Sequence, residues 1–540
     1  MFNTSTYYRY GLAERSWNLT ILTTSPGEAY SLYFLGTVNL TVDWGDGNIN
    51  NYTTNGIKSN TYASAGTYVV KIRGTVNGGT IAQDFTAGYA NAAKVINTSA
   101  IRGITFSGTC NMGDSFRACT NLSTIPYNLF RYCSNITNFY ATFGGCTSLS
   151  SIPTDLFKYN TSVSNDAFNS TFIGCSSLSS IPIDTFRYNT DVSSNGFYNT
   201  FFDCTSLASI PTDLFRYNTD VSSNGFSGTF RECSDLTAIP VDLFRYNTLV
   251  TTNGFNTAFY RCTSLASIPT DLFRYNTVVT TAGFSNTFNA CAITSIPVDL
   301  FRYNTVVTTN SFEQTFFNCT SLNSIPTDLF RYNTVLGNNG FAGTFLGCTS
   351  LSSIPTDLFR YNTLVTGSTF ANTFNGCAIT SIPVDLFRYN NAAGLTGFSA
   401  TFINCTSLTS IPTDIFRYNT VVTDFSNTFL GCLNITNIQN DLFRYNTSAI
   451  SFVNCFIGCN KATLNDNIFG PDLLTTRFLN QNVNFTGCFR LTGSFTGVQG
   501  TAPDLWSAAY GTGTPTTTLC FDGHSISSVI NYASIPLAWK

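Results

Sequence analysis

Hydrophobic positions recur along this chain with a fixed period. The string Thr-Phe-x-x-Cys-Thr-Ser-Leu-x-Ser-Ile-Pro-Thr-Asp-Leu-Phe-Arg-Tyr-Asn-Thr returns almost unchanged over most of the sequence, and its cysteines are separated by 27 to 29 residues. Such a period is typical of proteins in which each repeat forms one coil that packs on its neighbours. The pattern predicts a repeat solenoid of about fourteen coils. The marking cysteines are Cys119, Cys146, Cys175, Cys204, Cys233, Cys262, Cys291, Cys319, Cys348, Cys377, Cys405, Cys432, Cys459 and Cys488.

Phenylalanine forms three columns in this repeat, which together contain 39 of the 49 Phe residues. In one coil, Phe226, Phe230 and Cys233 are spaced i, i+4, i+7. This spacing predicts a short helix that carries two rings and a thiol on one face. We expect that face to be buried.

The rest of the coil predicts smaller elements. Leu236 and Ile239 fit a short strand or turn, and residues 240–245 fit a second helix of one or two turns, because Pro suits the first helical position. Residues 247–254, Asn-Thr-Leu-Val-Thr-Thr-Asn-Gly, predict a turn-rich loop that closes the coil. This segment differs most between coils, so we expect it to bury little.

Both ends of the chain depart from the repeat. Apolar residues alternate in residues 17–22, 38–44 and 66–74, which predicts β-strands. At the far end, the string Phe-Asp-Gly-His over residues 521–524 is similar to Phe-x-x-Cys with His in place of Cys. We therefore expect residues 491–540 to form a degenerate last coil that covers the end of the stack.

Length and composition exclude several classes of function and partner. A chain of 540 residues is too long for one small core, and a net charge of −3 leaves no excess positive charge for phosphates, so we expect no nucleic-acid partner. One histidine, His524, excludes multi-His metal sites and Ser/His/Asp triads within the repeats. No apolar run approaches the ~18 residues that span a bilayer, and no export signal is visible near Met1. We expect a soluble protein without membrane insertion.

The repeat string resembles the BspA-like leucine-rich repeats of microbial surface proteins and their phage-encoded relatives. Val-Asp-Trp-Gly-Asp-Gly over residues 42–47, followed by Thr-Tyr-x-x-x-Gly-Thr-Tyr-x-Val-x-Ile over residues 61–72, resembles the PKD-like immunoglobulin-type sandwich. These resemblances imply a small all-β PKD-like domain followed by a leucine-rich-repeat-like solenoid. The expected divisions are an arm over 1–16, the sandwich over 17–76, a connector and N-terminal cap over 77–109, the solenoid over 110–490 and the capping coil over 491–540.

The cysteine column admits three interpretations: buried thiols, a disulfide ladder or a metal-binding row. We favour buried thiols, because free cysteine behaves as a small hydrophobe and no Cys-x-x-Cys occurs. Asp and Arg at i, i+3, as in Asp213 and Arg216, recur from coil to coil and predict a charge-balanced lattice. A column of near-identical carboxylates provides no single active site, so we predict no enzyme, no catalytic residue and no cofactor.

Two further groups of side chains are candidate ligand sites. A column of tyrosines is expected to cover the arginine stems, and the strip that the tyrosines and arginines form also suits a glycan through stacking and hydrogen bonds. Asp43, Asp46 and Asn48 suit either Ca²⁺ or, as we favour, a self-stabilised Asp-Gly turn, so no metal site is assigned. The strip comprises Tyr217, Tyr246, Tyr275, Tyr303, Arg216, Arg245, Arg274 and Arg302.

The resemblances and the composition favour a non-enzymatic phage virion surface protein, such as a fibre, spike or decoration protein. It would be made in the host cytoplasm and displayed on the virion. The alternative is a bacterial cell-surface adhesin. The expected partners are other virion or surface-assembly proteins, bound through the N-terminal region, and a host-surface glycan or protein.

Overall fold

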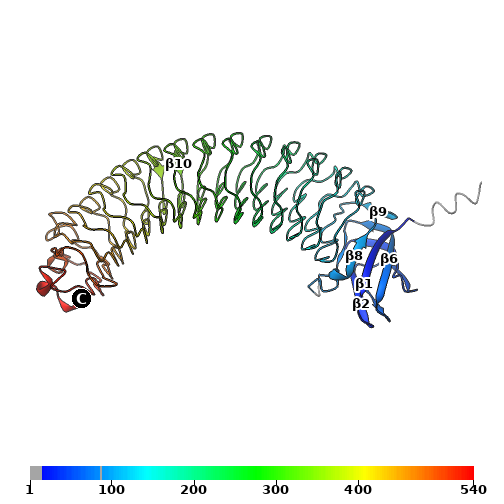
Figure 1. Cartoon of the computed structure of the whole chain (residues 1–540), viewed down its shortest axis with the longest axis horizontal. Helices are drawn as coiled ribbons and strands as arrows, with labels where there is room; N and C mark the ends of the chain where they lie inside the picture. The colour runs from blue at the N-terminus through cyan, green and yellow to red at the C-terminus, as the bar shows by residue number, and fades with distance from the viewer. Residues whose placement is uncertain (1–14, 86–87) are drawn as a thin grey trace, which may run out of the picture. The chain divides into compact units, whose positions relative to one another are not determined.

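The computed structural model describes residues 15–85 and 88–540 (Figure 1). The chain divides into two compact units, of which the first contains Met1–Val250 and Arg261–Leu265 and the second contains Thr251–Tyr260 and Ala266–Lys540. The predicted arm over 1–16 lies almost entirely outside the described residues. The units are described one at a time below.

The first unit begins with a domain of two β-sheets, drawn in blue in Figure 1. One sheet has the order β4-β3-β6-β1-β8, with β9 paired to β6, and the other has the order β5-β2-β7. Their alternating side chains bury a core that includes Leu19, Tyr30, Trp44 and Ile72. The strands are β1 (Trp17–Thr23), β2 (Glu28–Phe34), β3 (Thr37–Asp43), β4 (Ile49–Tyr52), β5 (Gly56–Tyr62), β6 (Gly66–Asn77), β7 (Ile81–Gln83), β8 (Val95–Thr98) and β9 (Ile104–Ser107), and the 3₁₀ turn η1 (Ala92–Lys94) precedes β8.

The strand domain extends beyond the predicted boundary at residue 76. Strands β7, β8 and β9 complete its two sheets, yet they are three or four residues long. All three residues of β7 are buried, so this strand lacks the alternation by which strands are recognised. Segment 77–109 also contacts the first coil, because the buried Gln83 Nε2 donates to the Ser115 carbonyl at 2.9 Å.

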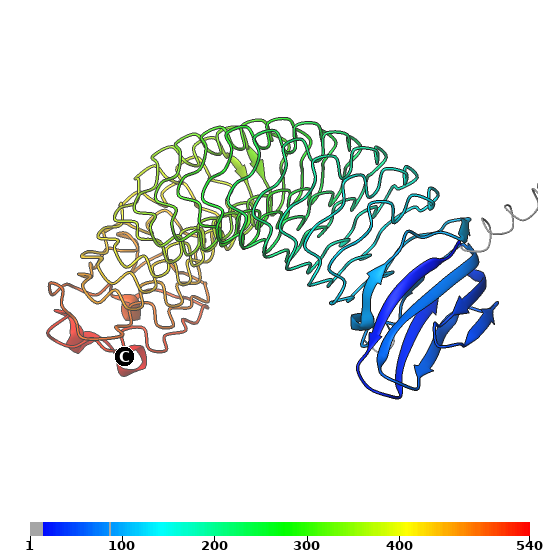
Figure 2. The same ribbon diagram turned by 45° about the vertical axis from the view of Figure 1, so that its right-hand side comes forward.

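The coils that follow are made of turns, and the short helices predicted over 226–233 and 240–245 are wrong. Figure 2 shows the coils as successive loops without helical ribbon, and the two segments consist almost entirely of turns. Asn224, Gly228 and Glu232 have positive φ values of 54°, 64° and 59°. A residue in the left-handed conformation at every fourth position prevents the chain from continuing as a regular α-helix.

The backbone hydrogen bonds explain this arrangement. In the coil at 195–204, the N–H groups of every second residue, such as Phe197 and Phe201, donate to carbonyls of the next coil at 2.9 Å. The residues between them, such as Thr200 and Cys204, donate within the coil to the carbonyl three residues earlier. Every N–H in this segment therefore has an acceptor, half of them on the next coil, which binds successive coils much as strands bind in a sheet.

The interior of the coils is filled by the predicted phenylalanine columns. In the first unit, Phe172 and Phe201 stack with centroids 5.6 Å apart and rings almost parallel. In the second unit, Phe316 lies between Phe288 and Phe345 at 5.8 and 5.7 Å. These rings are fully buried. Repeated stacks of buried aromatic rings thus contribute apolar contact between neighbouring coils, beside the buried Leu, Ile, Val and Cys residues.

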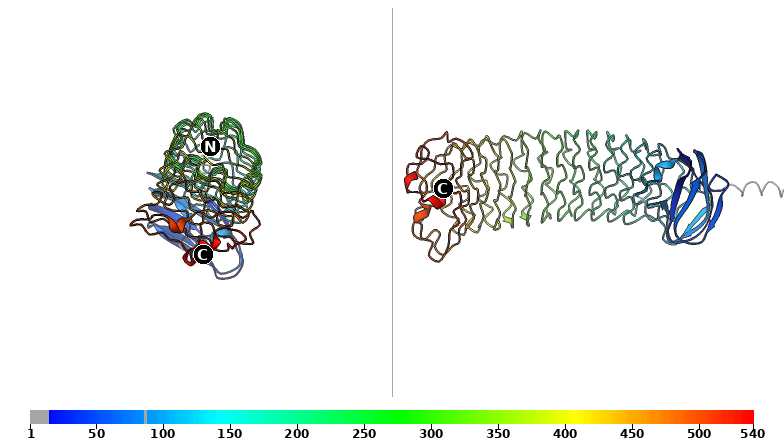
Figure 3. Two further views of the ribbon diagram at one scale, coloured as in Figure 1. Left: turned by 90° about the vertical axis from the view of Figure 1, so that its left-hand side faces the viewer. Right: turned by 90° about the horizontal axis from the view of Figure 1, so that it is seen from below.

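The second unit adds a few regular elements. Strands β10 (Val335–Leu336) and β11 (Leu364–Val365) pair in parallel between adjacent coils. The 3₁₀ turns η2 (Leu505–Ser507), η3 (Tyr532–Ser534) and η4 (Leu537–Trp539) lie in the C-terminal segment, drawn in red in Figure 3. Among the described residues, no helix has the length and apolar character needed to cross a membrane.

The C-terminal segment continues the stack, as its sequence predicts. Phe521 stacks on Phe489 at 5.3 Å, in line with Phe456 beneath it. Trp539 in η4 is buried, and its carbonyl accepts the N–H of Phe521. The Phe521 N–H thus bonds to η4, whereas the equivalent N–H groups of earlier coils bond to the next coil.

Candidate functional site

Three rows of polar side chains fasten one coil to the next. Each row follows a phenylalanine column in the motif Phe-x-x-Z, where Z is Thr, Cys or Asn. The Thr200 hydroxyl donates to the Phe168 carbonyl at 2.9 Å, and the Cys204 thiol donates to the Phe172 carbonyl at 3.2 Å. The Asn218 amide donates to the Phe186 carbonyl at 3.1 Å. The recurring polar residues therefore donate hydrogen bonds to backbone carbonyls of the preceding coil.

The asparagine row is the part of this scheme that sequence reasoning missed. Asn218 begins the Asn-Thr segment predicted as exposed loop, yet it is fully buried. Its Nδ2 donates a second hydrogen bond to the Asn189 carbonyl at 2.7 Å. The prediction that this segment buries little is wrong at this position, because the buried carbonyls of the preceding coil require donors. The row consists of Asn160, Asn189, Asn218, Asn247, Asn276, Asn304, Asn333, Asn362, Asn390, Asn419 and Asn446.

An arginine ends the asparagine row. Arg477 is buried, and its Nη2 donates to the Asn446 carbonyl at 2.8 Å, where the next asparagine of the row would donate. Its guanidinium lies 4.3 Å from the ring centroid of Phe478. Burial lowers the pKa of Arg477 to about 10, which leaves the group charged at neutral pH.

All eighteen cysteines are free and buried. Desolvation raises the pKa of Cys146 and of Cys319 to about 12, so the reactive thiolate is scarce at neutral pH. This environment agrees with the interpretation of the column as buried thiols.

Cys488 does not belong to the cysteine column, contrary to the sequence prediction. It precedes Phe489 as Cys455 precedes Phe456, and the Phe456 N–H donates to the Cys488 carbonyl at 2.8 Å. Cys455, Cys488 and Cys520 therefore occupy the threonine position of the motif. The step of 29 residues from Cys459 to Cys488 matches the repeat only because the intervening coil is longer.

The thiols should behave as inert core groups. We expect thiol counting in denaturant, without reductant, to find most of the eighteen cysteines free, and counting on the folded protein to find few. Because the cysteines donate hydrogen bonds as thiols and form no disulfide bonds, dithiothreitol should leave the melting temperature unchanged. A melting temperature strongly shifted by reductant, or few free thiols in denaturant, would contradict this.

His524 takes over the role of the column cysteine in the last coil. Its Nε2 lies 2.8 Å from the Phe489 carbonyl, the contact that a thiol makes in the earlier coils, and its Nδ1 lies 3.0 Å from the Ser528 hydroxyl. Burial lowers the pKa of His524 below its usual value. The sequence-based prediction that His524 stands in place of the repeat cysteine in the last coil agrees with this position.

Acidification should loosen the last coil. An unfolded histidine takes up a proton near pH 6.5, whereas folded His524 does so only at lower pH, so stability is complete above about pH 6.5 and falls as the pH drops toward the folded pKa. Hydrogen exchange of residues 489–540 should accelerate more between pH 7.5 and 5 than intrinsic exchange accounts for. His524→Cys restores the repeat residue and should reduce the effect; an equal effect in this variant would exclude His524 as its source.

The predicted strip of tyrosines and arginines forms an alternating ladder on the surface of each unit. In the first unit, Tyr217 lies between the guanidiniums of Arg187 and Arg216, at 5.3 and 5.7 Å from the ring centroid. In the second unit, Tyr303 lies between those of Arg274 and Arg302, at 5.3 and 5.6 Å. Two guanidiniums thus lie within cation–π distance of each ring, and a sugar that stacks there would compete with them.

Each arginine of the ladder also pairs with the aspartate three residues earlier. The Asp213–Arg216 and Asp299–Arg302 pairs have separations of 3.4 and 3.3 Å. The remaining strip residues repeat these contacts: Tyr246 with Arg216 and Arg245, Tyr275 with Arg274, Asp242 with Arg245 and Asp271 with Arg274. The predicted charge-balanced lattice is confirmed as ion pairs within each coil, which are partly exposed and individually weak.

The carboxylates at the Asp-Gly turn hold the turn itself. The Asp43 Oδ1 accepts from the Gly45 N–H at 3.0 Å, and the Asp46 Oδ1 accepts from the Asn48 N–H at 3.0 Å. The second oxygen of Asp46 accepts from the amides of Asn48 and Asn60. The favoured interpretation as a self-stabilised turn agrees with this geometry.

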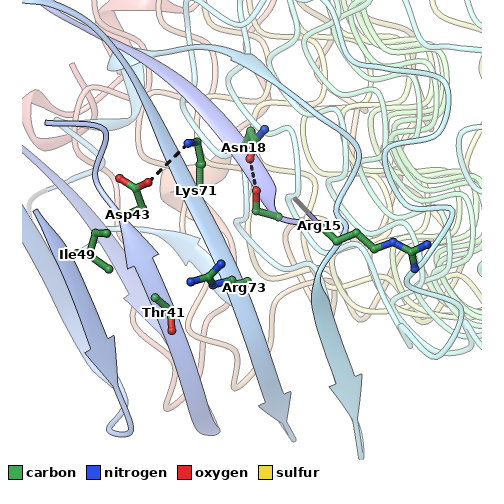
Figure 4. Close-up of a pocket in the computed structure, with 8 residues that line it drawn as sticks. Arg15, Asn18, Thr41, Asp43, Ile49, Lys71 and Arg73 are labelled. Carbon is green, nitrogen blue, oxygen red and sulfur yellow. Dashed lines mark hydrogen bonds and ion pairs between the residues drawn. The ribbon is translucent and has the colours of Figure 1, made fainter. Parts of the chain in front are cut away.

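A shallow hollow of about 330 Å³ lies on the face of the larger sheet. Figure 4 shows Lys71 and Asp43 pointing toward one another across neighbouring strands, with the nitrogen 3.6 Å from the carboxylate. Thr41 and Arg73 lie beside this pair. The hollow is a polar, partly charge-balanced surface.

Comparisons with known proteins add little. No protein-family model matches the chain, and no curated protein is similar to it. Among solved structures, a crystal structure of a TLR13–ssRNA13 complex is similar over 71% of this chain and 68% of that chain, with 11% sequence identity and a TM-score of 0.20. A likeness at this level carries no argument about fold or ligand.

Proposed function

We propose that this chain is a non-enzymatic phage virion surface protein, a fibre, spike or decoration protein, whose coils face the host. One observation carries this proposal: the recurring Thr, Cys and Asn side chains are hydrogen-bonded to the adjacent coil, and the Asp and Arg side chains are paired with each other. Side chains used in this way suit a stable scaffold, and they favour a protein displayed on a surface over an enzyme. The BspA-like and PKD-like resemblances support a surface location.

The virion assignment can be tested by mass spectrometry of particles purified from a lysate. We expect peptides of this chain in the virion fraction at a fixed ratio to the major structural proteins. Detection in the surface fraction of uninfected bacteria, with none in virions, would instead support a bacterial adhesin.

We also propose that the N-terminal strand domain attaches the protein. In cross-linking of intact virions with an amine-reactive reagent, Lys58 and Lys71 should be joined to other virion proteins, because the Lys71 side chain is exposed and the Lys58 side chain is partly exposed on the strand domain. Lys461 and Lys540, near the other end of the sequence, serve as the comparison. Cross-links from these two alone would place the attachment at the C-terminal end.

A further inference from the structure

A second groove in the first unit lies where the strand domain contacts the first coils. Its volume of about 440 Å³ lies within the range of about 300–1,000 Å³ that is typical of small-ligand sites. Tyr33 on β2 and Phe85 beyond β7 contribute from the strand domain, and Asn111, Asn138 and Tyr140 contribute from the coils. The groove is open to solvent and lies apart from the ladder of tyrosines and arginines.

Exposed aromatic rings are the first notable feature of this groove. Phe85 is 44% exposed and Tyr140 is 43% exposed, whereas the phenylalanines of the coil interior are fully buried. Tyr33 holds Phe85 by an edge contact, with ring centroids 4.7 Å apart. In the described part of the chain no guanidinium is found over the ring of Phe85 or of Tyr140, so the exposed part of each ring is available to a ligand.

The polar lining is the second feature. The Asn111 Oδ1 accepts from the Gly113 N–H at 2.8 Å, and the Asn138 Oδ1 accepts from the Tyr140 N–H at 3.3 Å. These bonds fix the two amides and leave their Nδ2 groups as donors. Asp166 accepts from Asn169 through one oxygen and retains lone pairs for a further donor. The groove thus offers donors and acceptors together, the combination that hydroxyl groups satisfy.

Charge restricts the class of ligand further. Asp114 and Asp166 line the groove, and no lysine or arginine does so among the described residues. Arg117 neutralises Asp114 from outside the lining, at 3.0 Å. An anionic ligand would face the carboxylate of Asp166 without a compensating cation, which disfavours sialylated or uronic-acid sugars.

We propose that this groove binds a neutral oligosaccharide, with C–H faces of the sugar on Phe85 and Tyr140 and hydroxyls on Asn111, Asn138 and Asp166. This inference deepens the proposed function and rests on it in one respect, because the proposed function is what makes a host surface the source of the glycan. Binding itself is a property of the purified chain, so it can be tested without virions.

The experiment applies the full chain to a microarray of neutral hexose and N-acetylhexosamine oligosaccharides, printed beside sialylated and uronic-acid counterparts. The strongest neutral probe is then titrated by calorimetry against variants. Phe85→Ala and Tyr140→Ala should each weaken binding at least about tenfold, and Tyr140→Phe should retain it within about threefold. Tyr198→Ala is the matched control, because Tyr198 has the same place in a later coil and is 36% exposed, yet it lies outside the groove.

Melting curves of the variants should match that of the parent chain, since both aromatic rings are exposed. The proposal is overturned if no neutral probe binds, if acidic probes bind best, or if Tyr198→Ala weakens binding as much as Tyr140→Ala. Any of these results would leave the virion assignment standing, because mass spectrometry of particles tests that separately.

Discussion

Replacing Phe316 with alanine should lower the free energy of unfolding of the surrounding coils by about 3 to 5 kcal/mol, the usual cost of removing a buried aromatic ring. Phe316 is fully buried and lies between two stacked rings, Phe288 and Phe345. Neighbouring coils cannot close the cavity without breaking the hydrogen bonds between them. Urea unfolding followed by circular dichroism gives the overall change, and hydrogen exchange of residues 288–345 locates it.

Phe317 provides a matched control for this substitution. It follows Phe316 in the sequence, but its side chain is partly exposed, so Phe317→Ala should cost less than about 1 kcal/mol. Equal losses in the two variants would show that the stability of the core does not depend on the columns. A loss confined to Phe316→Ala, with faster exchange in adjacent coils, would show that stability passes from coil to coil.

The phenylalanine columns were predictable from the sequence, whereas the backbone that carries them was not. Phe226, Phe230 and Cys233 have helical spacing, but a run of four-residue turns brings the same positions to one face. The sequence did contain a signal for these turns, namely the type of residue at every fourth position. In the coil before, Asn195, Asn199 and Asp203 all have positive φ values, and Asn, Asp and Gly are the residues that tolerate this conformation.

The asparagine row and the groove depend on contacts between distant segments. Asn-Thr is ordinary turn chemistry within one coil, and only the carbonyls of the preceding coil make Asn218 a core residue. Phe85 and Tyr140 are 55 positions apart in the sequence, and the approach of the strand domain to the coils brings them to one groove. Local patterns carry no information on either arrangement.

Replacing Asn333 with aspartate should be among the most damaging isosteric changes in the chain. Asn333 is fully buried, and its Nδ2 donates to the carbonyls of Phe301 and Asn304 at 3.2 and 2.9 Å. A carboxylate there would oppose two carbonyl oxygens, and an uncompensated buried charge costs about 3 to 5 kcal/mol. Asn323→Asp is the control, because it adds the same charge at an exposed position of the same coil.

The pH dependence of the two variants separates charge from shape. Burial raises the pKa of a carboxyl group, so the carboxyl introduced by Asn333→Asp would remain protonated in the folded chain at a pH where the unfolded chain has already ionised, above about 3.9. The penalty should therefore be small at pH 3.5 and grow as the pH rises toward the raised folded pKa, beyond which it is constant. Urea unfolding of Asn333→Asp and Asn323→Asp at pH 3.5, 5 and 7.5, each compared with the parent chain, measures this. A penalty for Asn333→Asp that does not change with pH would show that the lost donor, and not a buried charge, is what the row cannot tolerate.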